Sequence, residues 1–321
     1  MLRGILLKIA ATLAFAVMST IIKLVSARFP VGEIVLFRSL FAMATLVAWL
    51  ARRGEFPGAL GTRRKLGHVG RSIAGSGGMF FGFIALSLLP LADATAFTFV
   101  SPLLIVPMAA LGLREVVRPY RWAAVGFGFV GVLVMLSDDL GQSAGATAGY
   151  SAGAAIALGG ALCTAVAMIQ TRRLSRSEAT GAIVFYFTSV TTFISATLLA
   201  LAAAWPIGAF GGEFFAGQRF VAPNGLEFGL LASIGLLGGA GQILMTASYR
   251  YADASIIAAF DYVSMIWAAT LGYAVFAETP SVAVLAGAAV VAAAGVYVVW
   301  RERPSRRVRP PVAAAETVQP G

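Results

Sequence analysis

Hydrophobic residues occur along the chain in runs of about twenty, and short polar or basic segments separate these runs. A helix rises 1.5 Å per residue, so about twenty apolar residues cross the ~30 Å hydrocarbon core of a bilayer. Reading the apolar runs between charges, Gly and Pro predicts ten transmembrane helices. The expected spans are 4–25, 32–51, 72–89, 92–113, 122–137, 150–171, 179–204, 227–249, 254–277 and 282–300.

Composition also favours an all-α integral membrane protein. Hydrophobic residues make up 59% of the chain and charged residues 12%, whereas soluble domains are about a quarter charged. The expected spans nearly fill the 321 residues, which leaves little sequence for a soluble domain. The first apolar run continues to Lys23 and is longer than the core of a signal peptide, so it is expected to be an uncleaved span.

The formal net charge of +10 indicates membrane topology rather than nucleic-acid binding, because the basic residues form short clusters between apolar runs. With the amino terminus in the cytoplasm, the expected cytoplasmic segments contain all 24 Lys and Arg residues except Lys8, Lys23, Arg28, Arg38 and Arg219. Both termini are therefore expected in the cytoplasm, in a multi-pass protein of a bacterial inner membrane. Residues 304–321 are expected to form a disordered tail near anionic lipid.

Short matches that keep the same order indicate an internal repeat. Lys23 pairs with Arg172, and residues 32–35, 91–94 and 131–134 resemble residues 181–184, 251–254 and 295–298. A second unit of five helices must enter the membrane from the side opposite to the first. Residues 1–141 and 142–303 are therefore expected to be inverted repeats, which many secondary transporters use to build a site at the membrane midplane.

With these features the chain resembles the EamA-like members of the drug/metabolite transporter superfamily. The likeness is carried by an Ala-Asp-Ala hairpin and a small-residue fifth helix in each half, by Phe37-Arg38-Ser39, and by Glu115 and Glu278. It covers nearly the whole chain and implies transport of a small organic metabolite, such as riboflavin, S-adenosylmethionine or an amino-acid-like compound, rather than catalysis.

The resemblance also implies which spans surround the substrate. Spans 4–25, 72–89, 92–113, 150–171, 227–249 and 254–277 are expected to line a central cavity. Spans 122–137 and 282–300 are expected at the periphery or in the contact of a homodimer.

Ionisable residues within the spans are candidate functional residues, because a charge inside a bilayer is costly. Asp261 lies about 10 Å into the span 254–277 and could bind a cationic substrate group, take up a proton, or only fix helix packing. Tyr262 follows it, and Ser101 precedes a proline in the equivalent part of the other half. Further polar candidates for the cavity are Ser19, Thr164 and Gln242.

Charged residues near span ends form two further groups. Arg38, Glu33 and Lys23 could form an external gate or a structural ion-pair network that holds the span 32–51. Asp93 and Asp253 open the spans 92–113 and 254–277, where a carboxylate either caps backbone amides or contacts substrate.

Other patterns exclude several classes of function. The G-x-G-x-x-G sequence at residues 126–131 lies inside an apolar span and lacks the strand that dinucleotide binding requires, so its small residues instead favour close helix or dimer contact. Cys163 is the only cysteine, and His68 is expected in a basic loop without a chemical role, so no metal or other cofactor is expected. The hypothesis is secondary transport by alternating access; a non-transporting membrane scaffold is the alternative.

Overall fold

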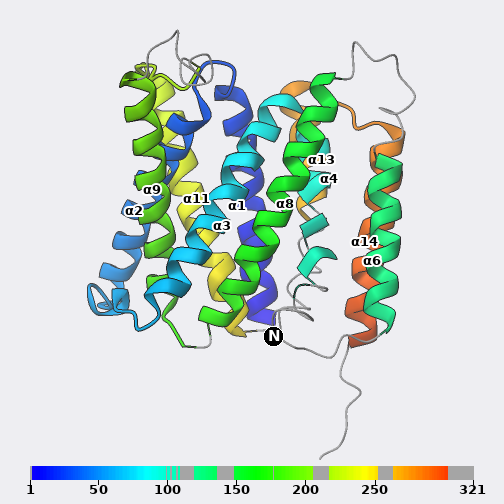
Figure 1. Ribbon diagram of the computed structural model, residues 1–321, viewed down its shortest axis with the longest axis horizontal. Helices are drawn as coiled ribbons and strands as arrows, with labels where there is room; N and C mark the ends of the chain where they lie inside the picture. Colours follow the sequence, from blue (N-terminus) through cyan, green and yellow to red (C-terminus); the bar gives the residue numbers. More distant parts are fainter. Residues whose placement is uncertain are drawn as a thin grey trace, which may run out of the picture.

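The computed structural model is a bundle of long helices that lie side by side (Figure 1). It describes residues 2–98, 100–101, 103–105, 108, 119–135, 148–175, 177–204, 217–251 and 263–302. Every regular element within these residues is helical. In chain order they are α1 (Leu2–Val25), α2 (Val31–Arg52), the short 3-10 helix η1 (Gly58–Leu60), α3 (Lys65–Leu88), α4 (Leu91–Thr98), α6 (Pro119–Met135), α8 (Ala148–Leu174), α9 (Thr180–Ala204), α11 (Gly225–Tyr251), α13 (Val263–Phe276) and α14 (Val282–Glu302).

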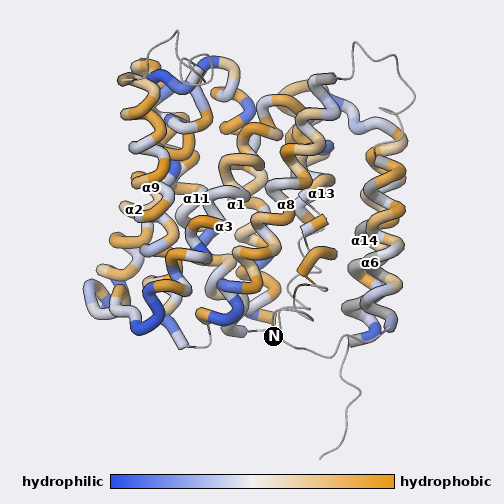
Figure 2. Tube along the Cα trace, in the orientation of Figure 1, coloured by the Kyte–Doolittle hydropathy of each residue, from blue (hydrophilic) through white to orange (hydrophobic). Residues whose placement is uncertain are grey.

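Within this part of the chain, six helices are long and apolar enough to cross a bilayer: α1, α2, α3, α8, α9 and α11. Shorter apolar stretches lie in α13 and α14. Hydrophobic residues cover much of the length of the helices, and hydrophilic residues gather toward their ends (Figure 2). The expectation of a helical, multi-pass membrane fold is confirmed. The number of ten spans stays a prediction, because residues 136–147 and 252–262 and most of 99–118 lie outside the described residues.

Helices from the two halves of the chain pack against each other in pairs. α1 packs along α11, α2 along α9, α3 along α8 and α6 along α14. The α6–α14 pair lies at one edge of the bundle and the α2–α9 pair at the other (Figure 1). The two small-residue helices therefore pack against each other within one chain, which confirms the expected close helix contact. A dimer through these helices stays a prediction.

Glycines allow two of these helix pairs to approach closely. A Cβ atom at Gly235 of α11 would overlap the Cβ of Phe41 and lie 3.0 Å from the backbone oxygens of Phe37 and Arg38. In α3, a Cβ atom at Gly78 would lie 2.6 Å from the hydroxyl oxygen of Thr164. Small residues at such contacts let the two helix backbones approach closely, because no large side chain lies between them.

The start of α3 differs from the expected span. This helix begins at Lys65 rather than at residue 72. The basic residues there indicated a loop, but a helix can extend beyond the hydrocarbon core, where long Lys and Arg side chains are solvated by headgroups and water. As a result Arg71, expected in a cytoplasmic segment, lies inside a helix.

Candidate functional site

Two buried arginines, Arg38 of α2 and Arg71 of α3, lie inside the bundle. They are 3% and 4% exposed, respectively. Each lies about two turns from the start of its helix, which is about 10 Å along the axis. Since α2 and α3 run in opposite directions (Figure 1), the starts of these two helices lie at opposite ends of the bundle.

The aromatic ring of Phe187 in α9 is the point where the two arginines converge. The guanidinium carbon of Arg38 lies 5.5 Å from the centroid of this ring, and that of Arg71 lies 4.0 Å from it. Both distances are within the range in which a cation is attracted to an aromatic face. The two positive charges therefore lie no farther apart than the sum of these distances.

Two glycines leave the space that the guanidinium groups occupy. A Cβ atom at Gly238 of α11 would lie 2.9 Å from Nε of Arg38 and 2.9 Å from the sulfur of Met18 in α1. A Cβ atom at Gly75 of α3 would lie 3.1 Å from Nη1 of Arg71. The pair is thus bordered by α1, α2, α3, α9 and α11.

Among the described residues, no carboxylate forms an ion pair with either arginine. Arg71 donates from Nε to the hydroxyl oxygen of Thr171 in α8 at 3.1 Å. Nε and Nη1 of Arg38 and Nη1 of Arg71 are buried without a hydrogen-bond partner, and so are the hydroxyls of Ser39 and Ser72. Buried polar groups are normally hydrogen-bonded, so the cluster has donors available for an anion.

Glu33 does not neutralise Arg38, although both lie in α2. Their separation of five positions places them about 140° apart around the helix. Glu33 is 0% exposed, and its Oε2 accepts a hydrogen bond from the backbone N–H of Val221 at 2.9 Å. The acid therefore ties the start of α2 to the segment before α11.

Lys23, the third residue of the expected gate or ion-pair network, has a different partner. Its Nζ lies 3.0 Å from Oε1 of Glu278 and donates to the backbone oxygen of Leu89 at 2.6 Å. Oε2 of Glu278 accepts from the backbone N–H of Leu91 at 2.9 Å. This network joins the end of α1, the α3–α4 turn and the segment after α13. A gating role for these residues stays a prediction.

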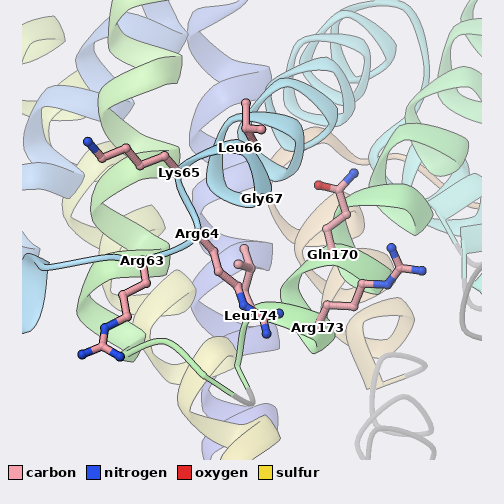
Figure 3. A pocket seen from close by; sticks show the side chains of 8 residues that line it. All are labelled: Arg63, Arg64, Lys65, Leu66, Gly67, Gln170, Arg173 and Leu174. Atoms are coloured by element: carbon pink, nitrogen blue, oxygen red, sulfur yellow. The ribbon is translucent and has the colours of Figure 1, made fainter.

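A basic pocket of about 540 Å³ opens where α3 begins and α8 ends (Figure 3). Gln170 and Arg173 project into it from α8, opposite Arg64 of the segment before α3. None of its lining residues is acidic. They are Arg63, Arg64, Lys65, Leu66, Gly67, Gln170, Arg173 and Leu174. By the positive-inside rule, this concentration of cations is the basis for expecting this end of the bundle in the cytoplasm, and the orientation stays a prediction.

His68 is buried rather than exposed in a loop, so its expected position was wrong. It lies in the first turns of α3 and is 1% exposed. Its Nε2 is 3.6 Å from Oε2 of Glu178, and its ring packs against that of Tyr186 at 4.7 Å. The early start of α3 explains the difference, because it turns the end of a basic loop into a helix face packed on α9.

The other predicted substrate residues are dispersed. Gln242 is 6% exposed, and its amide donates to the hydroxyl of Thr246 on its own helix at 3.4 Å. Thr164 and Ser19 are half-buried, and Thr164 faces the α3 glycine described above. Ser101 is 5% exposed. Asp261, Tyr262 and Asp253 lie outside the described residues, so the proposed site at the middle of spans 92–113 and 254–277 stays a prediction.

Asp93 lies in the first turn of α4, as expected of a residue that interacts with a helix start. It is 6% exposed, and its Oδ2 accepts a hydrogen bond from the hydroxyl of Tyr150 in α8 at 3.0 Å. The carboxylate therefore also connects α4 to α8. Its assignment as a helix cap stays a prediction.

Arg71 is the site residue that the sequence interpretation missed. A helical signal was present, since Ser72, Gly75 and Ser76 follow it at the spacing of one narrow helix face. Small and hydroxyl residues beside an arginine favour a packed, polar interior over a solvated loop. Treating basic residues only as topology markers concealed this pattern.

Comparisons with known proteins agree with the membrane fold. Residues 2–137 match the EamA-like transporter family. The pseudopaline exporter CntI of Pseudomonas aeruginosa is 31% identical over 293 residues, covering 91% of this chain and 94% of that protein. A riboflavin transporter of Rhizobium johnstonii is 26% identical, covering 96% and 94%. An S-adenosylmethionine uptake transporter of Rickettsia prowazekii is 24% identical, covering 85% and 84%.

One solved crystal structure has the same fold. Its chain is 22% identical and superposes with a TM-score of 0.63, covering 94% of this chain and 97% of its own. The similarity supports the arrangement of the helices from end to end.

Proposed function

The chain belongs to the EamA-like transporter family of the drug/metabolite transporter superfamily, and we propose that it is a secondary transporter that exports a small organic metabolite from the cytoplasm. The observation that carries the direction is the 31% identity to the pseudopaline exporters, which extends over nearly the full length of both proteins. The uptake transporters of S-adenosylmethionine reach 23–25%.

Alternating access around inverted repeats is the proposed mechanism. If α8 is the counterpart of α1 and α11 that of α3, exchanging the halves converts the α1–α11 contact into the α3–α8 contact, and both are extensive. The α6–α14 contact maps onto itself under the same exchange. This exchange symmetry supports a rotation axis between the halves, which lets one site open to either side in turn.

The proposed orientation places both termini in the cytoplasm of a bacterial inner membrane. The basic pocket lies at the end of the bundle where α3 begins, which is also the end where α2 finishes with Arg52 and Arg53. The opposite end pairs its exposed Arg28 with Glu227. The concentration of basic residues at the first of these two ends supports the assignment.

Comparison of culture media would test export. A bacterial strain that produces the full chain should enrich at least one metabolite in the medium relative to a strain that produces Gly78→Leu, in which a side chain is forced into the α3–α8 contact. Gly82→Leu is the matched control, because a Cβ atom there meets nothing within 4 Å. Membrane abundance of each protein is measured alongside. Equal media from all three strains would contradict export.

Uptake of riboflavin is the second candidate function. The observation that favours it is the riboflavin transporter similarity, which covers 96% of this chain. Uptake of labelled riboflavin and S-adenosylmethionine into the same cells distinguishes it from export. A chain that moves no solute in either direction would instead fit the non-transporting scaffold.

A further inference from the structure

Within the part of the chain that the structure describes, Arg38 and Arg71 have no acidic partner although both are buried, and this carries an inference about the substrate. We propose that the two arginines bind a carboxylate group of the transported molecule, so that the substrate is an organic anion. This assignment rests on the proposed function, since it names the class of molecule that the transporter carries.

The energetic cost of the pair is the first step. A buried charge without a partner is strongly unfavourable, both in a protein interior and at membrane depth. Three other described cations have acidic partners: Lys23 pairs with Glu278, Arg28 with Glu227 and Arg53 with Glu55. Two unpaired arginines that share one aromatic ring therefore need a counter-charge from outside the described chain.

The geometry of the donors fits a carboxylate. A guanidinium is planar and can donate two parallel hydrogen bonds to a carboxylate. Arg38 offers the buried Nε and Nη1, which lie on different edges of its guanidinium and donate separately, and Arg71 offers the buried Nη1 while its Nε is held by Thr171. The hydrogen bond to Thr171 uses only Nε of Arg71, so Nη1 is available to donate to a ligand. Phe187, itself 4% exposed, adds an apolar ring in contact with both arginines.

A basic entrance supports access of an anion from the cytoplasm. Gln170 lines the cytoplasmic pocket, and the next residue in α8 is Thr171, which binds Arg71. Gly70, which precedes Arg71, faces Gln170: its Cβ atom would lie 3.0 Å from the amide oxygen. The pocket therefore lies next to the turns of α3 and α8 that carry Arg71 and Thr171. Its Arg and Lys residues attract anions and raise their local concentration.

The competing explanation is that both arginines only stack on Phe187 and hold α2, α3 and α9 together. Stacking predicts that changing either arginine destabilises the protein whether or not an anion is present. Anion binding predicts that changing either arginine reduces the stabilisation of the protein by an added anion. A measurement with and without ligand therefore separates the two explanations.

The test uses the purified full chain in nanodiscs of phosphatidylcholine, and it measures the unfolding temperature against ligand concentration. Glutarate and citrate are the carboxylate probes, and glutaramide is an uncharged molecule of the same shape as glutarate. Glycerol 3-phosphate tests for a phosphate site. Discs that contain phosphatidylglycerol test whether a lipid headgroup occupies the pair. Variants are Arg38→Gln, Arg71→Gln and Arg71→Lys, with the exposed Arg53→Gln as the matched control.

The expected result is stabilisation of the unmodified protein by glutarate or citrate but not by glutaramide. Half-saturation should need at least about tenfold more carboxylate in Arg38→Gln and Arg71→Gln, with Arg53→Gln unchanged. Arg71→Lys should lie between, because it keeps the charge but loses the planar donor pair.

Several results would overturn the assignment. One is an equal response to glutarate and glutaramide, and another is a stronger response to glycerol 3-phosphate than to the carboxylates. A third is a response to carboxylate that phosphatidylglycerol abolishes and that added carboxylate does not restore. The last is a set of arginine variants that respond like the unmodified protein. If a variant does not fold, the comparison of glutarate with glutaramide on the unmodified chain still decides. Export without carboxylate binding would refute only this assignment, and carboxylate binding without export would refute only the proposed function.

Discussion

Replacing Arg38 by methionine should stabilise the ligand-free protein. The substitution removes the charge and retains an unbranched side chain in the space beside Gly238. It leaves Arg71 and its hydrogen bond to Thr171 unchanged. A functional arginine that is costly in the empty state is expected to show this inverse relation between stability and activity.

The size of the effect follows from three contributions. At the greatest separation of the two guanidinium groups that their distances to Phe187 allow, and with an effective dielectric constant of about 20, their repulsion is about 1.7 kcal/mol. Removal of buried nitrogens without hydrogen-bond partners recovers a further ~1–3 kcal/mol. Loss of the attraction between Arg38 and the Phe187 ring costs about 0.5–2 kcal/mol.

The balance favours the variant by about 2 kcal/mol, or an upward shift of roughly 3 °C in unfolding temperature for a chain of 321 residues. Thermal unfolding in phosphatidylcholine nanodiscs at low salt, without carboxylate buffers, measures it. Arg53→Met is the control, because this arginine is exposed and its pair with Glu55 contributes at most about 1 kcal/mol. A fall in the unfolding temperature of Arg38→Met would refute the reasoning and show that Arg38 stabilises the empty fold.

Three further substitutions test other parts of the structure. Gly235→Ala should destabilise the protein by about 1–3 kcal/mol in thermal unfolding, because the added Cβ atom meets the backbone of α2. Gly229→Ala is the control and should change the stability little, because a Cβ atom there meets nothing within 4 Å. Equal effects of the two substitutions would contradict the close α2–α11 contact. Glu278→Gln should loosen the Lys23 network and cost about 1 kcal/mol, seen as faster proteolysis at the end of the bundle where α1 finishes and α4 begins. Unchanged digestion would show that this network carries little stability. Thr171→Val should weaken carboxylate binding by roughly threefold by releasing Arg71, and a loss as large as that of an arginine substitution would contradict its supporting role.

The fold class was predictable from sequence because the length and apolarity of a span are dictated by the bilayer. α1, α2, α8, α9 and α11 lie within a few residues of the expected spans. α3 begins seven residues before the expected span, since composition alone does not distinguish a basic loop from a basic helical turn at the membrane surface. The same ambiguity placed His68 and Arg71 in a loop.

The candidate site was only partly predictable. Arg38 could be selected because its charge falls within an apolar run. Its neighbours could not, because Arg71 and Phe187 lie on other helices, and their convergence depends on how helices from the two halves pack. For the same reason Lys23 pairs with Glu278, a distant residue in the chain, and not with an acid near it in sequence.

Accessibility of the arginine pair from both faces tests the central claim most directly. Met18 is buried beside Arg38, so Met18→Cys in a chain that also carries Cys163→Ser places one thiol at the site. A membrane-impermeant, anionic methanethiosulfonate reagent is applied to intact cells and to inverted vesicles. Alternating access predicts labelling from both sides, slowed by a transported carboxylate. Labelling from one side only, or from neither, would contradict it.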